Sequence, residues 1–275
     1  KKFYNKNIKK IPNFFDKKLI DKYLKKEKAK IISSISMFYD LPNPLKFAED
    51  VYSSLDNQGV WHLEQSYAGS MLKQNSYDTI CHEHLEYYSL RSIKYIFDRV
   101  KFKIIDISFN DINGGSFAIT VAKKNSNHKE IKRKIKKILD FEKNNNINSP
   151  KKYKQFFESI NLEKKKLIHS LKKLKSKNKK VIGYGASTKG NVILQFCNIN
   201  SDLLKQICDV NIEKDGTFTP GTNIPIIKEK KAKKENPDYF FVLPWHFKKF
   251  ILKKEKKNIK KGIRFIFPLP KFHIV

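Results

Sequence analysis

The chemistry of this chain centres on His82-Glu83-His84, in which two imidazoles flank a carboxylate. A histidine held beside a carboxylate keeps one tautomer and a pKa near neutrality, which suits a general base. The spacing does not suit a metal, because the helical zinc pair needs two histidines four residues apart. We therefore expect a deprotonating site without a metal. The alternative is that the three residues are satisfied polar groups at a strand-to-helix junction.

Glu64 adds a carboxylate at the end of an apolar segment, residues 59–64, that we expect to be a strand. In an open parallel sheet the carboxyl ends of the strands face the ligand crevice. Glu64 is then placed to orient a base or to bind substrate hydroxyls. A rim carboxylate paired with one of the many lysines is the alternative.

Residues 183–190 (GYGASTKG) predict a second site, because they form a glycine turn between a strand and a helix. Glycines let backbone N–H groups approach a phosphate, and a helix N-terminus favours an anion. The spacing departs from the dinucleotide fingerprint and from the P-loop. Asp209 ends the next predicted strand and could either meet a ribose hydroxyl or cap the following loop. A plain tight turn is the alternative for the whole segment.

Two α/β units are expected to position these motifs. The first contains the predicted strands 28–36, 59–64, 103–109 and 116–122 and the helices 17–26, 44–56 and 89–99. Its last two strands are joined by turn residues and predict an antiparallel hairpin. The second contains strands that begin at 181 and span 206–210, 239–243 and 264–268, with helices over 192–196 and 247–252. The expected domains are 1–124, a helical linker over 125–179, and 180–275.

The formal net charge of +31 over 275 residues raises the question of a nucleic-acid partner. The excess is mostly lysine, whereas bidentate recognition of bases and phosphates uses arginine. We therefore expect no specific nucleic-acid partner, and steep salt-dependent DNA binding would contradict this. The three cysteines are too scattered for a disulfide framework and fit a reducing cytoplasm. No apolar run is long enough to span a membrane, so we expect no membrane partner.

Taken together, these segments resemble the sugar-nucleotide C-methyltransferase family, whose S-adenosylmethionine (SAM)-dependent enzymes methylate a carbon of a nucleotide-linked keto-sugar. The matching segments occur in order along essentially the whole chain, at 64–67, 71–72, 77–89, 113–116, 183–191 and 220–225. The resemblance implies an α/β fold, with the C-terminal part of a class I methyltransferase (Rossmann-like) sheet followed by a second Rossmann-like domain. Nothing here resembles the family's zinc-binding N-terminal domain or its acidic-Gly-x-Gly cofactor loop. The sequence therefore looks N-terminally truncated, with zinc expected only in the missing domain.

The resemblance also implies residue roles. His84 would remove the acidic proton beside the sugar ketone, and the enolate would attack the methyl group of SAM. The residues that would hold this base or bind the sugar are Glu83, His82 and Glu64. The cofactor pocket would be walled by Ser36, Met37 and Phe38. The nucleotide-sugar substrate would be bound by Tyr87, Asn113, Ser116, Gly183, Gly185, Ser187, Lys189 and Asp209. The alternative function is a non-catalytic nucleotide-sugar-binding fragment or module.

Overall fold

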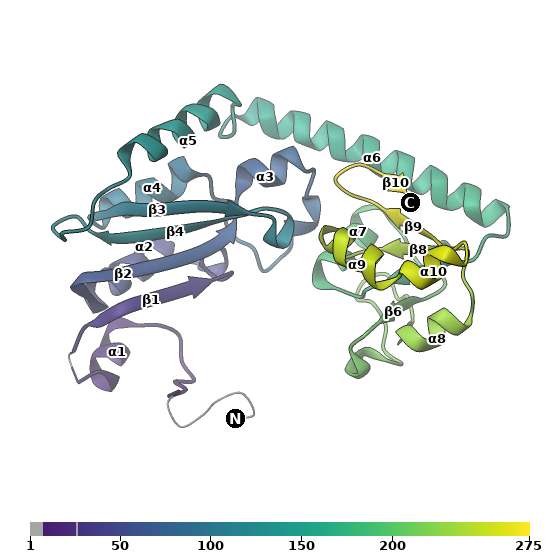
Figure 1. The fold of residues 1–275 in the computed structure, drawn as a ribbon, viewed down its shortest axis with the longest axis horizontal. Coiled ribbons are helices and arrows are strands. Elements are labelled where there is room, and N and C mark those ends of the chain that lie inside the picture. The colour runs from purple at the N-terminus through teal and green to yellow at the C-terminus, as the bar shows by residue number, and fades with distance from the viewer. Residues whose placement is uncertain (1–7, 26) are drawn as a thin grey trace.

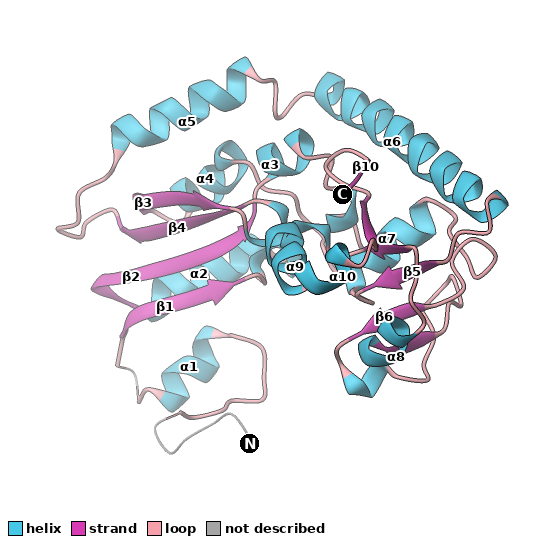
Figure 2. Cartoon of the chain, turned by 45° about the vertical axis from the view of Figure 1, so that its right-hand side comes forward, coloured by secondary structure: helices cyan, strands magenta, loops and turns pink. Residues whose placement is uncertain are grey.

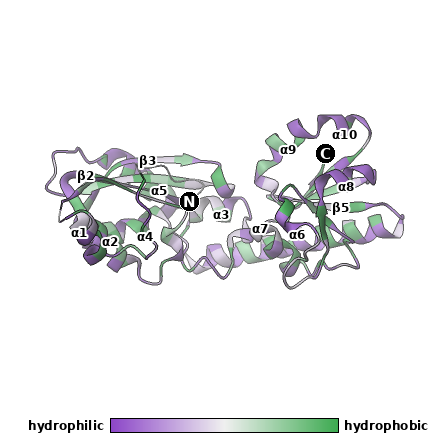
Figure 3. Cartoon of the chain, turned by 90° about the horizontal axis from the view of Figure 1, so that it is seen from below, coloured by the Kyte–Doolittle hydropathy of each residue, from purple (hydrophilic) through white to green (hydrophobic). Residues whose placement is uncertain are grey.

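The computed structural model describes residues 8–25 and 27–275. The chain forms two sheet-based lobes, and two long helices run along one side of them (Figure 1). Figure 3 shows hydrophobic residues concentrated in the interior of each lobe and hydrophilic residues on the outer helices. The predicted α/β class with two Rossmann-like sheets is confirmed.

The first lobe is built on a four-stranded mixed sheet in the order β1-β2-β4-β3. The strands are β1 (Ala29–Ile35), β2 (Leu55–Ser66), β3 (Phe102–Asn110) and β4 (Ser116–Lys123). β1 and β2 are parallel, and β4 is antiparallel to both β2 and β3. The predicted hairpin is therefore present, with its second strand inserted next to β2. β2 begins four residues earlier than predicted, because Leu55 already pairs with Ala29.

The helices of the first lobe are α1 (Lys17–Tyr23), α2 (Pro44–Ser54), α3 (Ala68–Lys73) and α4 (Leu90–Arg99), with short 3-10 turns η1 (Phe38–Asp40), η2 (Tyr77–Thr79) and η3 (Ile112–Gly114). Three of these helices, α1, α2 and α4, begin at a residue whose side chain caps the first turn. Ser89 caps α4 in a capping box, at the first residue of the helix predicted over 89–99. The core is aromatic and surrounds Trp61, which is fully buried and donates a hydrogen bond from Nε1 to Ser34 Oγ at 2.8 Å.

The charged middle of the chain forms the predicted pair of helices, α5 (Lys132–Asn144) and α6 (Pro150–Ser176) (Figure 2). α5 is tied to the first lobe by the buried carboxylate of Glu142. That carboxylate accepts hydrogen bonds from Tyr67 Oη and from the backbone N–H groups of Leu90 and Arg91. α6 instead buries Ile160, Leu167 and other apolar residues in the core of the second lobe. The domain boundaries after residues 124 and 179 stay a prediction.

The second lobe holds a six-stranded sheet in the order β10-β9-β8-β5-β6-β7, parallel except for β10. Its strands are β5 (Val181–Tyr184), β6 (Ile207–Asp209), β7 (Ile226–Lys228), β8 (Tyr239–Val242), β9 (Arg264–Phe267) and β10 (His273–Ile274). Its helices are α7 (Thr188–Phe196), α8 (Glu229–Lys234), α9 (Lys248–Lys254) and α10 (Lys256–Lys260), with the 3-10 turns η4 (Ile212–Lys214) and η5 (Trp245–Phe247). α7 begins four residues before the predicted helix, because Ser187 caps it by accepting the N–H of Gly190. Within the described residues, no helix is long and apolar enough to cross a bilayer.

Candidate active site

His84 lies in a tight turn after η2 and has the geometry of a neutral base. Its Nδ1 is 2.7 Å from the backbone oxygen of Thr79. A carbonyl oxygen only accepts, so Nδ1 carries the proton and Nε2 keeps a free lone pair. Burial lowers the pKa of His84 below its usual value of 6.5, although the nearby carboxylate of Asp40 raises it. The imidazole is therefore held in its neutral form, with Nε2 able to accept a proton.

The other two members of the His-Glu-His cluster do not share a site with His84. His82 and Glu83 are both exposed in the turn. Glu83 acts on His84 only through its charge. His82 lines a pocket that His84 does not line. The cluster diverges because successive residues of a turn point in different directions.

The expected cofactor segment lies beside His84. The backbone oxygen of Tyr39 accepts hydrogen bonds from the N–H groups of Leu85 and Glu86, and the ring centroids of Tyr39 and His84 are 4.3 Å apart. Ser36 adopts a left-handed conformation with φ of 52° and donates its N–H to the backbone oxygen of Glu64. The carboxyl ends of β1 and β2 thus meet the His84 turn.

The three residues expected to wall the cofactor pocket differ in exposure. Ser36 and Met37 are half-buried, whereas Phe38 is fully buried and packs its ring against Trp61 and Tyr88. Phe38 therefore supports the wall from inside the core. Sequence reasoning missed Tyr39 and Asp40, although both directly follow the predicted segment.

The turn between β3 and β4 brings part of the expected substrate site to the second lobe. Asn113, Gly114 and Gly115 all have positive φ. Ser116 is buried and donates its hydroxyl to the backbone oxygen of Ile112, so this hydroxyl serves the turn itself. The backbone oxygen of Asn113 accepts a hydrogen bond from Lys189 Nζ at 2.9 Å. Asn113 therefore marks a contact between the lobes.

Lys189 follows the glycine turn of the second lobe, but its side chain reaches the first lobe at Asn113. Burial lowers the pKa of its ammonium group, and the nearby carboxylate of Asp78 raises it. The positive charge of Lys189 also contributes to the lowered pKa of His84. Tyr87, another expected substrate residue, donates its hydroxyl to the backbone oxygen of His84 at 3.3 Å. The second lobe thus supplies a cation that acts on the candidate base.

A buried pair that sequence reasoning missed joins the two lobes. Asp78 is only 1% exposed, and its Oδ2 accepts a hydrogen bond from Trp245 Nε1 at 2.8 Å. Burial raises the pKa of Asp78 to about 6, although the charge of Lys189 opposes this shift. Burial, with a smaller contribution from Lys189, lowers the pKa of the neighbouring His246 to about 4. The sequence did point to this region, because Trp245 and His246 follow the carboxyl end of a predicted strand, where ligands bind in an open α/β sheet.

Replacing Asp78 with asparagine should change how stability depends on pH. The folded pKa of Asp78 lies above its unfolded value of 3.8. The folded state therefore binds the extra proton between these values, and stability from this group falls as pH rises through about 6. We expect the wild-type protein to lose about 3 kcal/mol relative to D78N between about pH 4 and about pH 7, measured by urea unfolding. The exposed control D202N should show no such trend, and parallel curves for wild type and D78N would contradict the assignment.

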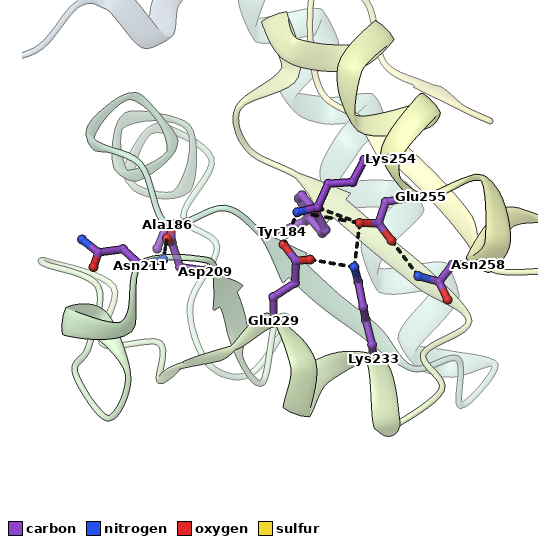
Figure 4. Close-up of polar contacts among 9 residues, drawn as sticks. All are labelled: Tyr184, Ala186, Asp209, Asn211, Glu229, Lys233, Lys254, Glu255 and Asn258. Atoms are coloured by element: carbon purple, nitrogen blue, oxygen red, sulfur yellow. Dashed lines mark hydrogen bonds and ion pairs between the residues drawn. The ribbon is translucent and has the colours of Figure 1, made fainter.

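The glycine turn of the second lobe has internal partners for its polar groups (Figure 4). The N–H of Ala186 donates to Asp209 Oδ2 at 2.7 Å. Lys214 Nζ donates to the backbone oxygen of Ala186. Gly185 is required for packing, because it has φ of 85° and an added Cβ would lie 2.7 Å from the ring of Pro244. Gly183 faces Ile207 at a similar distance. Gly185, Ser187 and Asp209 line one pocket, and Lys189 does not line it. The single site expected for these residues is therefore divided.

A pocket of about 850 Å³ lies between the lobes, next to the His84 turn. Cys81 and His82 form its first-lobe wall, and Phe157 of α6 and Asn191 of α7 form part of the opposite wall. The full lining is Tyr77, Ile80, Cys81, His82, Tyr153, Phe156, Phe157, Ile160, Thr188, Asn191, Val192, Gln195, Phe196 and Pro220. The pocket is thus lined by aromatic rings and by the first turn of α7.

Comparisons with known proteins agree on a family. The chain matches the models for a C-methyltransferase C-terminal domain over residues 111–270 and for a methyltransferase domain over residues 3–107. It is 28% identical over 247 residues to the C-methyltransferase NovU of Streptomyces niveus, covering 90% of this chain and 59% of that protein. The chain thus spans about three fifths of the length of this curated relative.

Two solved structures overlap with parts of the chain. One is the complex between the Haloferax volcanii Trm112 methyltransferase activator and the putative methyltransferase, with a TM-score of 0.32, 10% identity, and 37% of this chain and 57% of that chain covered. The other is a putative methyltransferase from Bacillus halodurans C-125, with a TM-score of 0.30, 12% identity, and 42% and 68% covered. Both overlaps include less than half of this chain.

Proposed function

The chain belongs to the C-methyltransferase family, and from this premise we propose that it transfers a methyl group from SAM to a carbon of a nucleotide-linked keto-sugar. In this proposal residues 1–124 carry the base and the cofactor wall, 125–179 join the lobes, and 180–275 help to bind the nucleotide sugar. The observation that carries the proposal is the single free lone pair on Nε2 of a neutral, half-buried His84.

The described residues fit one side of SAM. Gln65 and Ser66, at the carboxyl end of β2, have buried side-chain polar atoms that lack a partner within the described part of the chain. Ser36 and Met37 lie half-buried at the end of the neighbouring β1. These four side chains would hold the cofactor, which when bound supplies an electrophilic methyl group.

His84 would act on the carbon beside the sugar ketone. Nε2 takes the proton, and the electron pair of the broken C–H bond becomes an enolate. Such a carbon is acidic enough for an imidazole only if the negative charge on the enolate oxygen is stabilised. Lys189 is the second-lobe cation that acts on His84, and we assign this stabilisation to it. The enolate carbon would then accept the methyl group that the bound cofactor supplies, with the electron pair of the broken sulfur–methyl bond staying on sulfur.

We place the nucleotide part of the substrate in the pocket between the lobes. Phe157 and Phe196 offer ring faces for a base, and Thr188 and Asn191 offer hydrogen-bonding groups from the first turn of α7. The sugar would extend past Cys81 toward the His84 turn. In this position the substrate would contact residues from both lobes.

Calorimetry with SAM and with a nucleoside-diphosphate-linked 4-keto-hexose tests the proposal. We expect both to bind saturably, and labelled methyl groups from SAM to appear in the sugar. The non-catalytic alternative predicts binding of the nucleotide sugar without SAM binding or methyl transfer. Absence of nucleotide-sugar binding would contradict both functions.

A further inference from the structure

A second pocket lies apart from the proposed active site, at the carboxyl ends of the parallel strands of the second lobe. It has a volume of about 500 Å³ and is bounded by Gly185 after β5, Asp209 and Val210 at the end of β6, and Pro244 after β8. β6 and β7 lie on one side of β5, and β8 lies on the other. The direction of strand addition therefore reverses at β5 and β8. In open α/β sheets, ligands bind in the crevice at this switch point.

Large apolar side chains are exposed around the mouth of this pocket. Val210 is 73% exposed, Phe247 is 55% exposed and Phe250 is 66% exposed. Single exposed apolar residues are ordinary, but several around one concave site mark a binding surface. Two of the three are aromatic, and an aromatic face favours a planar ring as its partner.

The charged groups at one end of the pocket are already paired inside the protein. Asp209 accepts the N–H of Ala186 on Oδ2 and the N–H of Asn211 on Oδ1. Lys214 donates to the backbone oxygen of Ala186 and lies 3.7 Å from Asp209 Oδ2. The turn N–H that could have faced a phosphate is therefore used by a carboxylate of the same chain (Figure 4).

The charged groups at the other end are paired as well. Lys254 donates to Glu229 and to the hydroxyl of Tyr184. Lys233 bridges Glu229 and Glu255, and Glu255 also accepts from Tyr184. Figure 4 shows these side chains pointing toward one another. Two lysines thus balance two glutamates, and the described lining offers no unpaired cation to a phosphate.

We propose that this pocket is a second ligand site, separate from the active site, that binds the uncharged heterocycle and sugar of a nucleoside. The ring lies against Phe250 and Val210 at the apolar mouth. The ribose hydroxyls point toward Asp209, whose carboxylate oxygens each keep a lone pair beyond the bonds to Ala186 and Asn211. The phosphates of a nucleotide would add no binding energy in this pocket, because the lysines that could contact them are already paired with carboxylates of the protein.

Titration of the full chain with adenosine, AMP and ADP tests this site, with thymidine as a second probe. We expect saturable binding of a nucleoside, with AMP and ADP within about threefold of adenosine. F250A should weaken nucleoside binding by about tenfold or more, because stacking of a base on an aromatic ring contributes about 1–3 kcal/mol. The matched control is F218A, since Phe218 is 57% exposed in the same lobe and does not line the pocket.

Any of the following outcomes would overturn the site. The first is that neither adenosine nor thymidine binds saturably. The second is that ADP binds at least about tenfold tighter than adenosine, which would mean that the phosphates are recognised. The third is that F250A binds as the wild type does, or that a nucleotide-linked keto-sugar competes with adenosine, which would move the nucleoside to the pocket between the lobes.

Discussion

Replacing His84 with glutamine should reduce methyl transfer by about a hundredfold or more. A positioned general base contributes about 10²–10⁴ to the rate, and glutamine keeps the size of the side chain without accepting a proton. Nucleotide-sugar affinity should change little, because the proposed role of His84 is in the chemical step. The measurement is the rate at which labelled methyl groups enter the keto-sugar.

Deuterium exchange at the carbon beside the ketone isolates the proposed role of His84, since this step needs only the base and the sugar. We expect exchange in the wild type and its loss in H84Q. Because burial lowers the pKa of His84, exchange should persist as pH falls to the usual imidazole pKa and decline only below it. H169Q is the matched control, since His169 is exposed on α6 and does not line the pocket between the lobes, and it should exchange normally. Normal exchange in H84Q would show that another group is the base.

Replacing Lys189 with methionine should have the second largest effect, with methyl transfer lowered by about a hundredfold. Loss of one group that stabilises a developing oxyanion costs about 10²–10³ in kcat. The variant also loses the hydrogen bond from Nζ to the backbone oxygen of Asn113, which ties α7 to the turn between β3 and β4. Nucleotide-sugar binding should weaken more than SAM binding, as measured by calorimetry.

The pH profile distinguishes an electrostatic role of Lys189 from a purely structural one. The charge of Lys189 lowers the pKa of His84, so its removal should raise that pKa. The acid limb of deuterium exchange should then move to higher pH in K189M and return in K189R, which restores the charge. The exposed control K205M should match the wild type. If the acid limb of deuterium exchange lay at the same pH in K189M as in the wild type, Lys189 would have no electrostatic effect on His84.

Many of the elements were predictable because their signals act over a few residues. Ser89 caps α4 through a contact three residues away. The glycines after Asn113 form the expected turn between two antiparallel strands. The glycine turn of the second lobe leads from a strand into a helix, as predicted. Short or edge elements such as β7, α8 and β10 were missed because their periodicity covers too few residues.

The candidate site was predictable only in part. The sequence pointed to the His84 turn, to Glu64 and to the segment after β1, and these segments are in contact in the structure. It also grouped residues that the fold separates. His82 and Glu83 diverge from His84, and Lys189 leaves the pocket that contains Asp209.

By itself, the sequence determined the family and the α/β class and located the His-Glu-His segment, because motif residues and hydrophobic periodicity are properties of contiguous segments. Only the tertiary structure decided which distant residues meet. Asp78 and Trp245 are 167 positions apart and form one buried hydrogen bond. Lys189 in the second lobe donates a hydrogen bond to Asn113 in the first, and Asp209 accepts one from the N–H of Ala186. These contacts depend on how two packed cores and their sheets are oriented, and no local pattern encodes that orientation.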